Sequence, residues 1–165
     1  SHTFFSDGAL VPAEHVRRVE VLGYAAIAIT DHGNMFGVFE FVKEAQKKNI
    51  KPIIGCEFYL TFDRTKKEVL PGFGNDDDGS KGKKAFHQVL LAKNETGYKN
   101  LIKLCSLGFI EGMYYYPRID FALLKQYHEG IIATTCCLGG IVPQHILCKS
   151  EEEAENVFKE WLEGF

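Results

Sequence analysis

Four short apolar runs constrain the fold of this chain more than any other feature. They cover residues 24–30, 51–60, 86–92 and 130–135, and they are rich in Ile, Val, Leu and Ala. Their apolar residues are continuous and do not alternate with polar ones, which is typical of strands covered on both faces of a sheet. Residues 2–5 have the pattern of the tail of a further strand.

Helical patterns separate these runs, at residues 12–22, 36–49, 96–107 and 121–128. The clearest one follows Ser150, an N-cap residue, where three acidic residues precede an amphipathic stretch. Alternating strands and helices predict a parallel α/β architecture of about five strand–helix units, either a doubly wound sheet or a barrel. Residues 62–84 show no periodicity and predict a long polar loop.

The composition fits one soluble domain and excludes several classes of protein. At 165 residues, 45% hydrophobic and 25% charged, the chain is unlike disordered proteins, and no apolar run approaches the roughly 18 residues of a membrane span. The 19 Lys and Arg against 22 Asp and Glu argue against nucleic-acid binding by overall charge alone. Five cysteines, two of them adjacent, suit no disulfide framework, so we expect a reducing cytoplasm. The chain opens on Ser1 and its last helical pattern stops uncapped at Phe165, so we expect a domain incomplete at both ends.

Polar residues gather where the predicted strands end. In parallel α/β folds the ligand site lies at the carboxyl ends of the strands, so these residues are candidates for function. Their imidazole, carboxylate and thiolate groups are the ligands of zinc, manganese or iron, and a cluster of more than four suggests two or more ions. The candidates in chain order are His2, Asp7, Asp31, His32, Glu57, His87, Cys136 and Cys137. Of these, Glu57 lies late in its predicted strand and His87 begins its strand or lies within it.

Each candidate also has a purely structural interpretation. His32 fits a turn residue with Asp31 capping the next helix, His87 fits a core histidine with satisfied hydrogen bonds, and the adjacent cysteines fit small buried apolar residues. Glu57 is harder to explain in this way, because an ionised carboxylate in an apolar run must be paired or bound to a metal if it is buried. Glu57 therefore favours the functional interpretation.

Eight segments of the chain, taken in order, resemble motifs of the PHP (polymerase and histidinol phosphatase) domain. Residues 1–8, 28–34 with the sequence TDHG at 30–33, and 51–57 with GCE at 55–57 resemble its successive metal-binding motifs. The match continues at 87–94, 98–101, 116–120, 127–130 and 137–140, where the last segment reads CLGG. From residue 33 onward the chain resembles the amino-terminal PHP domain of the bacterial DNA polymerase III alpha subunit, whereas residues 5–14 are closer to free-standing PHP phosphoesterases.

The resemblance implies a fold and a ligand set. The fold is a distorted barrel of seven parallel strands with outer helices, of which this chain is a part, and it holds up to three divalent ions (Mn, Zn, Fe or Mg). Asp31 is placed behind a ligand imidazole, where it accepts a hydrogen bond. Arg118 is a candidate phosphate-binding fork, with a surface ion pair as the alternative. The implied catalytic residues are His32, Glu57 and Asp7, and the implied metal ligands are His2, Asp7, His32, Glu57, His87 and Cys137.

Two ligand motifs of the family fall outside the sequence, since the first His of its His-x-His motif would precede Ser1 and its late Asp-x-His motif would follow Phe165. We therefore expect the 165 residues alone to be inactive. In its parent, the resemblance implies a metal-dependent phosphoesterase site of a replicative polymerase, with a 3′–5′ exonuclease role and with DNA and other replicase subunits as partners. The alternatives are a free-standing phosphatase of small phosphate monoesters such as histidinol phosphate, and a non-catalytic docking domain.

Overall fold

The structure is a computed structural model that describes residues 11–76 and 79–164. The strand expected at residues 2–5, with the candidates His2 and Asp7, lies outside the described residues. Within them the chain forms a mixed α/β fold in which six helices pack around a six-stranded sheet. No helix of the described part is long and apolar enough to cross a membrane.

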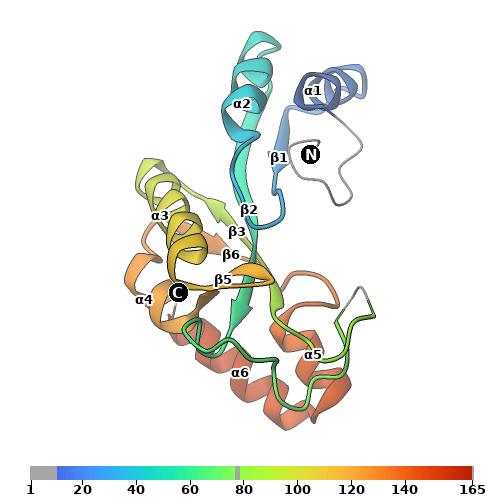
Figure 1. Cartoon of the computed structure of the whole chain (residues 1–165). Coiled ribbons are helices and arrows are strands. Elements are labelled where there is room, and N and C mark those ends of the chain that lie inside the picture. The colour runs from blue at the N-terminus through green and yellow to red at the C-terminus, as the bar shows by residue number, and fades with distance from the viewer. Residues whose placement is uncertain (1–10, 77–78, 165) are drawn as a thin grey trace.

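The long strand β2 (Lys51–Thr61) organises the sheet (Figure 1). Along one edge it pairs in parallel first with β1 (Ala26–Ile29) and then with β5 (Tyr116–Asp120). Along the other edge it pairs antiparallel with β3 (Phe86–Ala92), which in turn pairs antiparallel with β6 (Ile131–Ala133). The short β4 (Met113–Tyr114) completes the sheet beside β5.

The helices cover the two ends of β2 (Figure 1). Near β1 lie α1 (Pro12–Val21) and α2 (Val38–Lys47), and beside the rest of the sheet lie α3 (Glu95–Glu111) and α4 (Phe121–Tyr127). The chain then forms α5 (Ile141–Cys148) and α6 (Glu151–Gly164), which pack on each other. As predicted, Ser150 caps α6, since its hydroxyl accepts a hydrogen bond from the Glu153 amide.

Two apolar cores lie on either side of β2's midpoint. The smaller core joins α1, β1 and α2 around Phe41, which is completely buried. The larger core joins β2, β3 and β5 with α3, α4 and the last two helices, and it includes Phe58, Leu90 and Trp161. Because β2 contributes to both, the strand fixes the two halves of the molecule relative to each other.

The elements predicted within the described residues are confirmed in place, but the expectation of an all-parallel sheet is wrong. The pairs β2–β3, β3–β6 and β4–β5 are antiparallel. Continuous apolar runs show only that a strand is covered on both faces, and they carry no information on its direction. The elements β4, β5 and α5 were not predicted, because the β5 sequence YPRID has no apolar run and α5 carries Pro143 in its first turn.

The polar loop at 62–84 is confirmed as a segment without helix or strand among its described residues, but it is not loosely attached. Its Leu70 and Phe73 side chains are buried in the larger core. The Lys84 ammonium lies 3.1 Å from the Asp76 carboxylate, and both side chains are 5% exposed. The loop therefore packs as part of the domain.

Gly97 of α3 allows a test of how closely this helix packs against the start of β6. A Cβ at Gly97 would overlap the carbonyl of Gly130, the residue that leads into β6. In an ordinary helix Gly→Ala stabilises by about 1 kcal/mol. Here we expect Gly97→Ala to destabilise the fold by roughly 1–3 kcal/mol in urea unfolding, because α3 must move away from β6. Lys103→Ala, on the exposed face of α3, is the control and should stay within about 0.5 kcal/mol of the parent.

Candidate metal centre

Glu57, in the middle of β2, is the centre of the candidate site. Its carboxylate lies between two imidazoles: one oxygen is 3.2 Å from Nδ1 of His32, and the other is 2.9 Å from Nδ1 of His87. The Glu57 side chain is 15% exposed. The expectation that a buried Glu57 must be paired is therefore confirmed, and its partners are two of the residues selected from the sequence.

Backbone pairing brings His32 to this position. After β1 ends, the chain keeps the parallel register with β2, so that His32 forms a bridge with Glu57. The Glu57 amide donates to the Asp31 carbonyl at 3.0 Å, and the Gly33 amide donates to the Glu57 carbonyl at 2.8 Å. Gly33 has φ +64°, and a Cβ there would lie 2.9 Å from Pro117, so this turn requires glycine.

The antiparallel register of β2 and β3 places His87. Tyr59 stands opposite His87, and Glu57 stands opposite Val89. Residues 57 and 59 point to the same face of β2, because side chains alternate along a strand. His87 is thus the diagonal neighbour of Glu57 on that face, close enough for a long side chain to reach.

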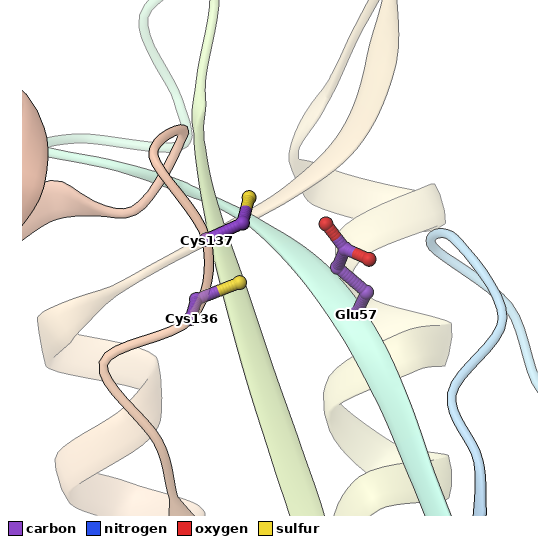
Figure 2. A group of neighbouring side chains, drawn as sticks. All are labelled: Glu57, Cys136 and Cys137. Atoms are coloured by element: carbon purple, nitrogen blue, oxygen red, sulfur yellow. The ribbon is translucent and has the colours of Figure 1, made fainter.

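A turn after β6 brings Cys137 to the same ring nitrogen of His87 that contacts Glu57. The Cys137 sulfur lies 3.6 Å from Nδ1 of His87 and accepts from the Gly139 amide at 3.4 Å. The His87 amide donates to the Gly139 carbonyl at 2.9 Å, which ties this turn to the start of β3. Figure 2 shows the adjacent Cys136 and Cys137 with their sulfurs facing Glu57.

The site lies at the carboxyl ends of β1 and β6, as the sequence predicted, but at the amino end of β3. Because β3 runs antiparallel to both β2 and β6, its first residues lie beside the ends of its neighbours. His87 is the second residue of β3. In the parallel direction predicted for this strand, His87 would lie at the opposite end of the sheet from His32 and the cysteines, and the antiparallel direction of β3 brings it beside them.

The two imidazoles control the charge of Glu57. Partial burial raises the pKa of this carboxyl group, but hydrogen bonds from His32 and His87 and the attraction of their charge outweigh it. The net effect lowers the pKa from its ordinary 4.5 to about 2. Glu57 is therefore an anion throughout the pH range in which proteins function.

The adjacent cysteines differ in their acidity. Burial raises the pKa of the Cys136 thiol to about 12, against a smaller lowering by its backbone hydrogen bonds. Burial also raises the pKa of Cys137, but the Gly139 amide and His87 more than compensate, so that this pKa lies below its ordinary value. Cys137 is thus the sulfur that ionises more readily without a metal, and its role as a ligand stays a prediction.

Two stacked tyrosine rings, Tyr59 and Tyr116, pack beside the site, and the sequence analysis did not predict them. The Tyr59 ring meets the His87 ring edge-on, with centroids 5.7 Å apart, and stacks on Tyr116 at 4.4 Å. These contacts restrict the imidazole orientation. The sequence could have indicated one of these rings, because Tyr59 lies two residues after Glu57 and therefore points to the same face of the strand.

Asp31 is buried beside the site, at 5% exposure. Its backbone carbonyl accepts from the Glu57 amide and from the Cys56 thiol at 3.3 Å. Asp31 is therefore fixed beside Glu57 through its backbone, and the contact of its carboxylate with a ligand imidazole stays a prediction. The roles of His2 and Asp7 also stay predictions, since both residues lie outside the described part of the chain.

Arg118 does not have either role expected for it. Its side chain is completely buried, so it forms neither a phosphate site nor a surface ion pair. Its guanidinium donates to the backbone carbonyls of Lys66, Glu68, Lys84 and Gly112, and it lies 4.8 Å from the centroid of the Tyr114 ring. Arg118 thus attaches the loop at 62–84 to the sheet.

The donor groups fit a divalent metal ion. Two imidazoles, a carboxylate and a thiol converge from β2, β3 and the segments after β1 and β6. This mixture is typical of ligands for zinc, iron or manganese, and it is unlike the all-oxygen sites of calcium or magnesium. Among the described residues, Glu57, Cys136 and Cys137 also form a group with donor atoms within 4.8 Å of one another.

The role of Arg118 can be tested through stability. Arg118→Met keeps the length of the side chain but leaves several carbonyls unpaired, so we expect the free energy of unfolding to fall by roughly 2–4 kcal/mol. Arg17→Met, on the exposed face of α1, should change it by less than about 0.5 kcal/mol. Equal stability of the two variants in urea unfolding would contradict the anchoring role.

The ionisation of Glu57 predicts a pH dependence of stability in the metal-free protein. A lowered folded-state pKa stabilises the fold fully above pH 4.5, and this contribution is lost as the pH falls toward about 2. The stability difference between the parent and Glu57→Gln should therefore shrink over this window when urea unfolding is followed at successive pH values. Glu155→Gln, which alters an exposed ion pair with Lys159, should give almost no such change.

Comparison with known proteins shows the family of this chain. The chain matches the PHP domain family over residues 1–165. It is 46% identical over 150 residues to the DNA polymerase III subunit alpha of Borreliella burgdorferi, covering 91% of this chain and 12% of that protein. It is 41% identical over 170 residues to the subunit alpha of Aquifex aeolicus, covering 99% and 14%. The chain thus spans about an eighth of the length of the relatives it matches. This chain belongs to the PHP domain family and is homologous to DNA polymerase III alpha subunits.

Proposed function

We propose that this chain is the metal-dependent phosphoesterase domain of a replicative DNA polymerase and that it hydrolyses the terminal phosphodiester at a DNA 3′ end. The observation that carries the proposal is the Glu57 carboxylate held between His32 and His87, with the Cys137 sulfur beside His87. The family is metal-dependent and has a phosphoesterase fold, and the relatives are DNA polymerase III alpha subunits. Together these observations favour a hydrolytic centre carried by a polymerase.

The proposed ligands are His32, Glu57, His87 and Cys137, with His2 and Asp7 added from the segment outside the described residues. A bound pair of divalent cations would supply a hydroxide near neutral pH and neutralise charge on the phosphate oxygens. Glu57 remains an anion for such a cation because its pKa is held near 2. His32 and Asp7 are the other two proposed catalytic residues, and like Glu57 they would act by holding the metal ions.

The fold supports a barrel in the complete domain. The described strands form a sheet in which β1 and β5 share one edge of β2, and β3 and β6 extend the other. We propose that this sheet is part of a distorted β/α barrel, mixed in strand direction. The 165 residues would then be one PHP domain that is completed by neighbouring parts of the parent polypeptide.

DNA and other replicase subunits are the proposed partners, through the parent polymerase. With a net charge of −3, these residues carry no excess of positive charge for phosphate contacts. Binding of a DNA end would therefore depend on metal ions at the site and on other parts of the parent. A small phosphate monoester as substrate, and a docking domain without catalysis, are the outcomes against which the proposal is tested.

The test uses the full-length polypeptide that contains this chain, loaded with manganese or zinc. We expect His32→Ala with Glu57→Ala to lower the metal content by at least one ion and to reduce 3′-end cleavage of a labelled oligonucleotide by at least about a hundredfold. His128→Ala, at the exposed C-cap of α4, should change neither quantity. Unchanged metal content in the double variant would exclude the site, and hydrolysis of p-nitrophenyl phosphate without cleavage of DNA would favour the small-substrate alternative.

A further inference from the structure

A second thiol lies inside the candidate site without a role in the ligand set. The Cys136 sulfur, the Cys137 sulfur and a Glu57 oxygen lie within 4.8 Å of one another (Figure 2). The resemblance assigns a single thiol ligand at this point, and that thiol belongs to Cys137. The function proposed above leaves Cys136 unused.

The backbone at Cys136 is held in an unfavourable conformation that brings this side chain into the site. Its φ is +62°, a left-handed value that is uncommon for any residue other than glycine or asparagine. The Cys136 amide donates to the Thr134 hydroxyl at 3.1 Å, which holds the turn. Such conformations persist where the surrounding structure fixes them, and they concentrate at functional sites.

Hydrogen bonds on both sides of the cysteine pair make the turn rigid. On the β6 side, the Gln88 amide group donates to the Thr134 carbonyl at 2.6 Å, and Gln88 is 2% exposed. On the α5 side, the Gly140 amide donates to the Cys137 carbonyl at 2.9 Å. A Cβ at Gly140 would lie 2.5 Å from the Thr135 carbonyl oxygen, so the two ends of the turn approach closely and this position requires glycine. The backbone that carries the two sulfurs is therefore held in place before any ligand binds.

We propose that Cys136 and Cys137 bind one metal ion together, as two thiolates beside the Glu57 carboxylate, and that this pair makes the centre selective for zinc over manganese. The inference rests on the proposed function and specifies which metal that site takes. Soft thiolate ligands favour zinc, whereas manganese prefers oxygen donors. A chain with a single thiol at this point would favour zinc less strongly.

The spacing suits two sulfurs on one ion. With Zn–S bonds of about 2.3 Å and tetrahedral angles, two such sulfurs stand roughly 3.8 Å apart. The observed group, with all donor atoms within 4.8 Å, needs only small side-chain rotations to reach that spacing. On binding, an S–Zn bond replaces the S–H bond of Cys136, and the proton passes to solvent. The cation also removes the repulsion between two adjacent thiolates.

The experiment replaces zinc with cobalt in the full-length polypeptide, because cobalt bound to thiolates absorbs in the near ultraviolet with an intensity that rises with the number of sulfur ligands. Cys136→Ser keeps the side-chain size, and Cys136→Gly removes the thiol while relieving the left-handed backbone. Cys148→Ser, an exposed thiol at the end of α5, is the matched control. Competition between zinc and manganese is measured on the same four proteins.

We expect the parent and Cys148→Ser to show a two-thiolate absorption that falls by about half in both Cys136 variants, with the zinc preference reduced at least tenfold. Cobalt bound with a one-thiolate spectrum that the Cys136 variants leave unchanged would overturn this inference while the proposed metal centre stands. No cobalt, zinc or manganese bound by the parent would overturn the proposed function, and this inference with it.

Discussion

The fold and the site both depend on the charge of Glu57 inside a mostly apolar strand. An unpaired carboxylate in this position would be costly, and two imidazoles remove the cost by contacting one oxygen each. Each imidazole comes from a different neighbour of β2: His32 from the segment after β1 and His87 from β3. The strands that pair with β2 are therefore also the elements that deliver the partners of Glu57. A change of register by one residue would turn these side chains away from one another and leave the charge unpaired.

The mixed direction of the sheet explains how so few residues assemble a site. With β3 antiparallel to β2 and β6, the start of β3 lies beside the end of β6. His87 and the cysteine turn consequently meet through a direct hydrogen bond from the His87 amide to the Gly139 carbonyl. The site is thus built at the end of the sheet where β1 and β6 finish and β3 begins, and the Tyr59 and Tyr116 rings support it from beside β5.

Outside the site, buried polar groups hold the irregular parts of the chain to the sheet. Arg118 has the planar N–H donors that could bind a phosphate, but in the structure they donate to backbone carbonyls of the loop at 62–84. The loop's composition is polar, yet Phe73 and the Lys84–Asp76 pair are buried. A polar composition indicates that a segment can lie at the surface, but it does not show which of its side chains are buried by neighbouring elements. For this reason the sequence identified the loop correctly and did not show its attachment.

The sequence by itself determined the positions of most helices and strands, because apolar periodicity and capping residues such as Ser150 act locally. It also determined which residue types can bind a metal, and His32, Glu57, His87 and Cys137 were selected before any geometry was known. The tertiary structure decided the direction of β3, the burial of Arg118, the support by Tyr59 and the entry of Cys136 into the site. The physical reason is that strand direction, burial and side-chain convergence depend on contacts between residues far apart in sequence, whereas periodicity and caps depend on neighbours within a few residues.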